Sequence, residues 1–223
     1  MDWSFILKFT PMYIDAAILT LKLAFISIIF SIAIGLICST IQYLNLPLLR
    51  RVIASYVQLS RNTPVLVYLF FLYFGLPKIG IMLSQELCAI LGLSFLGGGY
   101  MSETFRSGFE AIAPIQTESG FCIGLNKWQV IRYIVLPQAL QVSIPALCAN
   151  IIFLIKETSV VSVVALPDLV YVAKDLIGLY YKTDESLLML VIAYLLLLLP
   201  ISIICTIIER RIRYARFGNQ HTF

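Results

Sequence analysis

Residues 118–137 read ESGFCIGLNKWQVIRYIVLP, a polar and charged stretch between two strongly apolar parts of the chain. Gly124 suits the position just past a helix end, where the backbone turns left-handed and a Cβ costs energy. Asn126 can cap the next helix, because Gln129 follows three residues later as in a capping box. Pro137 lacks an amide hydrogen and disfavours helix at the preceding residue, so the second helix is expected to stop or kink there. The stretch predicts a compact helix-turn-helix.

The composition places the rest of the chain in a membrane. Of its 223 residues, 60% are hydrophobic and 13% are charged, and the mean hydropathy is +0.93. Such a chain cannot bury its apolar surface in one soluble core, so it belongs in a bilayer. The Met-Asp-Trp start has no basic n-region and no cleavage site follows it, so we expect the first apolar helix to serve as the insertion signal.

A transmembrane helix needs about 20 mostly apolar residues, and five segments meet this requirement. The weakest is the third, because Gly97, Gly98 and Gly99 interrupt it, although glycines are tolerated where membrane helices pack closely. The sequence thus predicts an all-α integral membrane protein with about five transmembrane helices, at 16–41, 64–83, 87–105, 140–166 and 187–208.

Basic residues set the expected orientation, because Lys and Arg are retained in cytoplasmic loops. One set of loops holds Arg50, Arg51, Arg61, Arg106, Lys127, Arg132, Arg210, Arg211, Arg213 and Arg216, and the opposite set holds Lys8, Lys78, Lys174 and Lys182. The larger set predicts that the 118–137 loop and the C-terminus are cytoplasmic and the N-terminus is outside. The net charge of +4 follows from this topology, so nucleic acid need not be invoked.

The flanking segments are expected to be short. Residues 1–15 are interpreted as an extracytoplasmic interfacial segment, with Trp3 and Tyr13 as anchors. Residues 167–186 are long enough for a short outer helix, and residues 214–223 form a cytoplasmic tail. One membrane domain, residues 16–213, accounts for the rest of the chain.

The spacing within residues 118–137 is similar to the loop by which ATP-binding-cassette importers dock their ATPase. That loop has an acidic residue, two small residues, a glycine six positions after the acid, and then Ile-x-Leu-Pro. The matching residues are Glu118, Ser119, Gly120, Gly124, Ile134, Leu136 and Pro137. Relatives usually have two Ala after the acid, and Gly120 is expected to weaken the first helix by about 1 kcal/mol. The resemblance implies a docking loop at 110–138, and the alternative is an amphipathic loop on the lipid surface.

Other blocks resemble the permease subunits of polar amino-acid importers of the histidine/glutamine type. They are YVQLSRNTPVLVYLFFLYFGLP at 56–77, YMSETFRSG at 100–108, the segment 143–150, and KETSVVSV at 156–163. This resemblance covers residues 16–213. It implies the type I ABC importer permease fold and import of a polar or charged amino acid, which is glutamine/glutamate-like, basic, or cystine.

The same resemblance implies the partners. They are two ATPase subunits that bind ATP–Mg, a second permease subunit that is identical or related, and an extracytoplasmic amino-acid-binding protein in a bacterial cytoplasmic membrane. We expect no cofactor on this chain and no ATP hydrolysis by it, because the sequence has no Gly-x4-Gly-Lys-Ser/Thr phosphate loop.

Charged residues in and beside the spans are the possible path or gate residues. Glu103 and Arg106 are three residues apart, so they share a helix face and can pair; the pair is either structural or part of a gate. Relatives often carry Glu at position 58. Gln58 therefore leaves Arg61 without one plausible local partner, and Arg61 is interpreted as an interfacial anchor.

Lys156 and Glu157 lie within the fourth predicted span, where ionisable residues are costly and face a cavity or a partner. Adjacent helical residues point about 100° apart, so these two cannot satisfy each other on one face. An amino-acid zwitterion offers a carboxylate to Lys156 and an ammonium to Glu157, with Thr158 beside them. The alternative is that both residues pair with other helices or with the second permease copy.

Other functional classes receive less support from the sequence. The five cysteines have no short paired spacing, and the single histidine, His221, lies in the polar tail, so no metal or redox site is predicted. A membrane enzyme lacks a nucleophile–base or metal-ligand constellation. An ion-gradient-driven secondary carrier is the main alternative, but it would be favoured by internal inverted repeats, and we find none.

Overall fold

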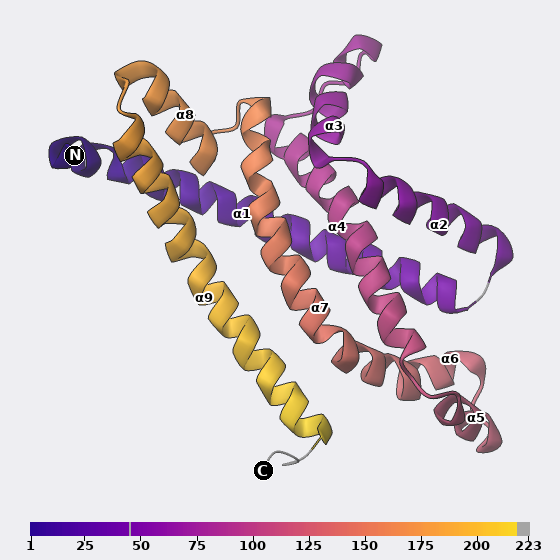
Figure 1. Cartoon of the computed structure of the whole chain (residues 1–223). Coiled ribbons are helices and arrows are strands. Elements are labelled where there is room, and N and C mark those ends of the chain that lie inside the picture. Colours follow the sequence, from indigo (N-terminus) through magenta and orange to yellow (C-terminus); the bar gives the residue numbers. More distant parts are fainter. Residues whose placement is uncertain (45, 218–223) are drawn as a thin grey trace.

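The computed structural model describes residues 1–44 and 46–217, which form a bundle of helices with no strand in the described part (Figure 1). In order along the chain the helices are α1 (Trp3–Tyr43), α2 (Pro47–Asn62), α3 (Val65–Phe70), α4 (Gln85–Glu110), α5 (Pro114–Cys122), α6 (Lys127–Val130), α7 (Leu136–Glu157), α8 (Leu169–Tyr180) and α9 (Thr183–Phe217). Three helices are extended by tighter or wider turns. The chain is π-helical at Phe71–Gly75 and Ile131–Val135, and 3-10 helical at Leu76–Ile79 and Thr158–Val164.

The first helix begins earlier than the sequence predicts. Asp2 caps α1 by accepting hydrogen bonds from the backbone amides of Ser4 and Phe5, at 3.1 and 3.2 Å. Because this cap satisfies two amides at the helix start, the helix runs without a break from Trp3 into the apolar segment. Residues 1–15 are therefore the first turns of α1 rather than a separate segment.

The second predicted span is a broken one. Helices α2 and α3 meet at an angle of 101°, because Pro64 disfavours helix at the residue before it. Thr63 is accordingly extended, with φ −112° and ψ 129°. The apolar stretch after the bend is helical only to Ile79, where Gly80 turns left-handed at φ +86°. Residues 47–79 are therefore a sharply bent pair of helices, with the geometry of a broken span or a re-entrant loop, rather than the single helix predicted at 64–83.

Helix α4, the weakest of the predicted spans, lies in the middle of the bundle and packs against α1, α2 and α7. Its glycines make these contacts possible, as in other membrane helix pairs. A Cβ at Gly97 would overlap Ser31 of α1, one at Gly98 would overlap Tyr56 of α2, and one at Gly99 would overlap Ser60 of α2. The glycines that interrupt the apolar pattern are thus packing positions.

Length and apolar composition identify three helices able to cross a membrane among the described residues, and the α2–α3 pair makes a fourth. The three are Trp3–Tyr43, Lys127–Val164 and Thr183–Ile212. Helix α4 is not among them, yet it packs against α1, α2 and α7 in the bundle. The all-helical architecture is confirmed, whereas the number of about five membrane segments stays a prediction.

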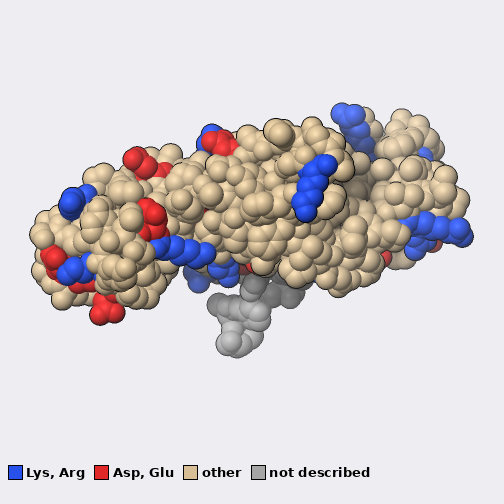
Figure 2. All heavy atoms as spheres, turned by 90° about the horizontal axis from the view of Figure 1, so that it is seen from above, with Lys and Arg blue, Asp and Glu red and all other residues tan. Residues whose placement is uncertain are grey.

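The two ends of the bundle differ. Helices α5 and α6 lie at the end where α9 finishes, whereas α8 and the start of α1 lie at the opposite end (Figure 1). Helix α8 lies within residues 167–186, as predicted, and Asp168 caps it. Seen from above, acidic and basic side chains gather over the end that carries α8, and the middle is largely uncharged (Figure 2). The predicted tail, 214–223, starts within α9, and residues 218–223 lie outside the described residues.

Candidate functional site

The helix-turn-helix between α4 and α7 has the predicted geometry. Gly124 is left-handed at φ +85°. The Leu125 amide donates to the Gly120 carbonyl at 3.1 Å, which closes the end of α5. Asn126 and Gln129 form a reciprocal capping box, with distances of 3.0 and 2.8 Å. The turn is therefore held by local hydrogen bonds, and we call residues 114–135 the docking arm.

Gly120 lets the two sides of the docking arm pack together. It is buried, and a Cβ there would lie 2.7 Å from Ile134 Cδ1 and 3.0 Å from Val130 Cγ2. Any helix weakening by glycine is thus accompanied by a closer contact than Ala would allow. Glu118 and Ser119 are exposed on the same helix, so these two predicted docking residues are available to a partner.

Pro137 does not end the second helix of the arm, and of the two expected outcomes, a stop or a kink, the structure shows the kink. Residues Lys127–Val164 form one continuous helical segment. The proline is accommodated by the π-helical turn at Ile131–Val135, in which the Leu136 amide donates to the Ile131 carbonyl. In this wider turn the hydrogen bonds span five residues, so the chain stays helical although Pro137 has no amide hydrogen to donate. The chain bends there between α6 and α7 (Figure 1). Leu136 and Ile134 are half-buried, and Pro137 is exposed.

The docking arm also exposes large apolar side chains that sequence reasoning missed. Isolated exposed apolar residues are common, but five on one short arm form a set that a partner could cover. We call them the docking patch: Ile115, Phe121, Ile123, Trp128 and Tyr133, which are exposed by 61, 48, 76, 63 and 64%. Their mixture with polar neighbours gave no periodic signal in the sequence.

The predicted Glu103–Arg106 pair is present on α4. It belongs to a longer row of paired charges, which we call the charge ladder: Arg61, Glu103, Arg106 and Glu110. Arg106 Nε and Nη2 donate to the two Glu103 carboxylate oxygens at 3.2 and 2.8 Å, and Nη1 donates to Glu110 at 2.6 Å. Arg61 Nη1 lies 3.4 Å from Glu103 Oε2. Arg61, which lacks a glutamate at position 58, therefore finds its partner on α4, while Gln58 accepts a hydrogen bond from Asn62 at 3.0 Å.

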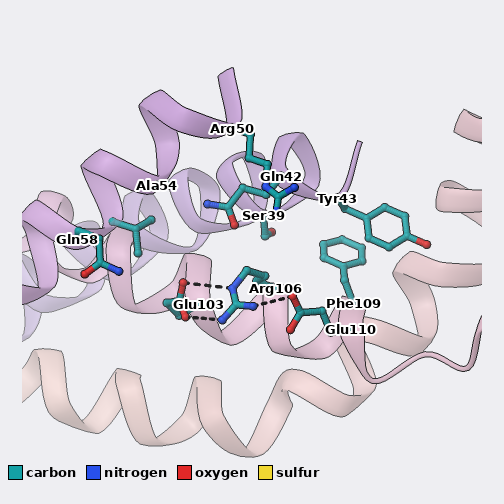
Figure 3. Close-up of a pocket in the computed structure, with 11 residues that line it drawn as sticks. Ser39, Gln42, Tyr43, Arg50, Ala54, Gln58, Glu103, Arg106, Phe109 and Glu110 are labelled. Carbon is teal, nitrogen blue, oxygen red and sulfur yellow. Dashed lines mark hydrogen bonds and ion pairs between the residues drawn. The ribbon is translucent and has the colours of Figure 1, made fainter. Parts of the chain in front are cut away.

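A cavity of about 350 Å³ borders this ladder on the side of α1 and α2. Figure 3 shows Arg106 pointing between the Glu103 and Glu110 carboxylates beneath the end of α1. The cavity is lined by Ser39, Gln42, Tyr43, Arg50, Ala54, Val57, Gln58, Glu103, Arg106, Phe109 and Glu110. Because its acidic groups are already paired with Arg106, it is a polar cleft between helices rather than a ready ionic site.

A second cavity, of about 470 Å³, lies at the bend between α2 and α3 and is closed on the other side by α4 and α7. It is lined by Arg61, Asn62, Thr63, Pro64, Val65, Leu66, Leu96, Tyr100, Phe153, Glu157 and Val160. The Arg61 guanidinium lies 5.5 Å from the centre of the Tyr100 ring, within the range of a cation–π contact. Arg61 thus lines this cavity and also contacts Glu103 in the ladder.

The three predicted residues at the end of α7 do not converge. Glu157 lines the second cavity, Lys156 is exposed and is not among its lining residues, and buried Thr158 donates to the Ile155 carbonyl at 2.7 Å. Their divergence follows from the rotation between successive helical residues. Arg61, Asn62, Thr63 and Tyr100 join the cavity instead, and the Arg-Asn-Thr-Pro motif was the available signal for three of these four.

Within the described residues, no group of three or more His, Cys, Asp or Glu side chains could hold a metal ion. The five cysteines are free thiols, and three of them are buried.

The continuous membrane helices, the central glycine-rich helix and the protruding docking arm together define a helical membrane transport component. Residues 31–214 match the family described as "Binding-protein-dependent transport system inner membrane component". The chain therefore belongs to that family, whose members are multi-pass inner-membrane permeases and non-catalytic subunits of importers.

Individual relatives agree with this assignment. The chain is 40% identical over 164 residues to the probable glutamine ABC transporter permease protein GlnP of Bacillus subtilis, covering 74% of this chain and 75% of the relative. It is 28% identical to the glutamine transport system permease protein GlnP of Escherichia coli, covering 95 and 98%.

Solved structures share the fold. One, described as an amino acid ABC transporter with histidines, matches with a TM-score of 0.87 and 29% identity, covering 95% of this chain and 99% of that one. The MetNI methionine ABC transporter in an inward-facing conformation matches with a TM-score of 0.72 and 20% identity, covering 90 and 98%. The type I importer permease fold is thus confirmed.

Proposed function

We propose that this chain forms the translocation path of an ATP-driven importer for a polar or charged amino acid, which is glutamine/glutamate-like, basic, or cystine. The observation that carries the proposal is the preorganised docking arm, with its exposed docking patch, in a chain of the binding-protein-dependent family. The names of the relatives support an amino-acid substrate. They give no support to the ion-gradient-driven carrier.

Two ATPase subunits bind the docking arms of two permease subunits, and ATP–Mg lies on the ATPases. A patch of exposed Trp, Tyr and Phe side chains is suited to such an interface, because aromatic residues supply much of the binding energy of protein contacts. Closure of the ATPases moves the docking arms and shifts the permease pair between two states that differ in access. An extracytoplasmic binding protein supplies substrate to the outward state.

The cavity at the α2–α3 bend is the part of this chain best suited to a zwitterion. Arg61 can bind a carboxylate through paired N–H donors, and Glu157 can accept from an ammonium group. Both side chains line the same cavity, whereas Lys156, which the sequence offered to the carboxylate as one of two alternatives, does not. Tyr100 and Phe153, whose rings lie 5.1 Å apart, provide an apolar wall for the substrate side chain.

The experiment is uptake into proteoliposomes that contain this permease, its ATPase and its binding protein, loaded with ATP–Mg. The probes are radiolabelled L-glutamine, L-glutamate, L-arginine and L-cystine. We expect uptake of one or more probes that requires internal ATP, and none with a non-hydrolysable ATP analogue. Uptake that needs a proton or sodium gradient and no ATP would establish the secondary carrier instead.

The proposed orientation has the docking arm and C-terminus in the cytoplasm and the N-terminus outside. It is supported by the placement of α5, α6 and the end of α9 at one end of the bundle (Figure 1) together with the basic residues there. In a variant without other reactive cysteines, because Cys122 on the same arm is exposed, a cysteine introduced at Asn126 should react with an impermeant maleimide only in inside-out vesicles, and one at Asp184 only in intact cells. The opposite pattern would invert the topology and remove the docking arm from the ATP compartment.

A further inference from the structure

The docking arm is covalently joined to α4 and α7, and it makes a third connection to the membrane helices at the end of α1. The Lys127 ammonium, at the first position of α6, donates to the Leu44 carbonyl oxygen at the end of α1, at 2.9 Å. The last carbonyls of a helix have no partner within it and carry its negative dipole end, where a cation is favourable. Helix α1 has no basic residue in its own last turn. Lys127 supplies that charge from the docking arm.

The end of α1 is also fixed to α4. The rings of Tyr43 and Phe109 are stacked, with centres 5.1 Å apart and planes 26° apart, and Phe109 is buried. Tyr43 and Phe109 border the same cleft as Glu103 and Arg106 (Figure 3). The end of α1 therefore lies between the docking arm and the charge ladder, and α2 starts directly after it at Pro47.

Helix α2 continues this connection to the substrate cavity. Arg61, in its last turn, contacts Glu103 and lines the cavity at the α2–α3 bend. Of the two covalent routes from the docking arm, the one to α4 passes through the non-helical residues 111–113, and the one to α7 crosses the π-helical turn at Ile131–Val135. Hydrogen bonding in such a turn is locally irregular, so part of a displacement along α7 would be absorbed there. The contact made by Lys127 lies before that turn and avoids it.

We propose that Lys127 is a positioning residue that transmits movement of the docking arm to the α1–α2 junction and, through α2, to the cavity at the α2–α3 bend. The proposal rests on the proposed function, because it needs the docking arm to move with an ATPase. The ammonium, rather than the aliphatic stem, makes the connection. Arginine keeps a charged donor of similar reach and should replace lysine here.

The test uses the complete complex in proteoliposomes and measures the ratio of substrate-stimulated to basal ATP hydrolysis, with the amino acid that the wild type transports. Lys127→Met should lower this ratio about five-fold, which corresponds to about 1 kcal/mol of coupling free energy at 25 °C. Lys127→Arg should restore most of the ratio. The matched control is Lys8→Met near the other end of α1, where the exposed ammonium lies over the ring of its neighbour Phe9 at 5.2 Å, far from the docking arm and both cavities; its ratio should change by less than about two-fold.

A second measurement separates transmission from docking. In a variant without other reactive cysteines, Gln42→Cys reports the cleft beside the end of α1, and its maleimide labelling rate should change when a non-hydrolysable ATP analogue binds. Lys127→Met should abolish that change while the ATPase still copurifies in full. Loss of copurification would make Lys127 a docking contact, and an unchanged ratio or unchanged labelling response would overturn the proposal. Absence of ATP dependence in the wild type would instead refute the proposed function.

Discussion

Gly35→Ala should destabilise the protein although it adds only one methyl group in a helix. Gly35 of α1 faces the backbone of α4. A Cβ at Gly35 would lie 2.7 Å from the Met101 carbonyl carbon and 2.8 Å from the Ser102 amide nitrogen, where ordinary contact begins at 3.4 Å. The new carbon would be about 0.6–0.7 Å too close to atoms that belong to a helix backbone. No side-chain rotation relieves this overlap, so α1 and α4 must separate.

The magnitude follows from two opposing terms. Overpacking of this kind costs about 1–3 kcal/mol, and replacing a helical glycine by alanine returns about 0.5–1 kcal/mol. The net expectation is a loss of about 1–2 kcal/mol, which for a chain of this size lowers Tm by about 2–8 °C. Gly178→Ala is the matched control, because Gly178 is exposed on α8 and its added Cβ would meet no atom within 4 Å. It should raise Tm by about 1–4 °C.

The test is thermal unfolding of the purified wild type and both variants in one detergent. All three are heated at one scan rate, because the apparent Tm depends on scan rate when unfolding is irreversible. Aggregation by size-exclusion chromatography gives a second readout of the same transition. If Gly35→Ala melts at or above the wild type while Gly178→Ala behaves as expected, then α1 and α4 are not in backbone contact at Gly35. The packing account of the α4 glycines would then be wrong as well.

Three further predictions concern the docking arm, the outer end and the cavity. Gly124→Val should reduce ATPase copurification and uptake without preventing membrane insertion, because a β-branched residue at φ +85° loses about 1–2 kcal/mol of conformational free energy. Gly124→Asn should have a milder effect on both measurements, and equal effects of the two substitutions would contradict the backbone argument. Burial raises the pKa of Asp168 from 3.8 to about 6, so between these two pH values the folded state binds more protons than the unfolded state. The Tm of the wild type relative to that of Asp168→Asn should therefore fall as the pH rises from about 4 to about 6 and then level off, and a rise in this Tm difference would refute the prediction. Glu157→Gln should weaken substrate stimulation of ATP hydrolysis in the assembled complex more than Lys156→Met does. The reverse order would indicate that Lys156, rather than Glu157, contacts the substrate.

The docking arm could be predicted because its signals are local. A left-handed glycine and a capping box are decided by a few neighbouring residues, and Gly124, Asn126 and Gln129 adopt the expected conformations. At Pro137 the local rule left two outcomes open, a stop or a kink, and the structure has the kink. A proline disfavours regular helix, but whether the chain stops or widens into a π turn depends on what the following helix contacts. Helix α7 is held by α4, for example through Asn150 donating to Thr104 at 2.8 Å.

The spans were harder to place because hydropathy measures composition and not packing. Pro64 lies at the start of an apolar run, and nothing in that run indicates that α2 would pair with it across a 101° bend. Gly97, Gly98 and Gly99 lower the apolar score of α4, and yet they allow it to approach α1 and α2. Their meaning depends on Ser31, Tyr56 and Ser60 of other helices, which no window over α4 contains.

The charge ladder shows why the candidate site was only partly predictable. Spacing on one helix identified Glu103 and Arg106, and the rotation between neighbouring residues correctly indicated that Lys156 and Glu157 need different surroundings. The contact of Arg61 with Glu103 joins two helices, and spacing within α2 shows only that Gln58 offers Arg61 no carboxylate there. That contact places one guanidinium between the cavity at the α2–α3 bend and the ladder that ends next to the docking arm. If this cavity binds the substrate as proposed, a substrate carboxylate and Glu103 would compete for the same group.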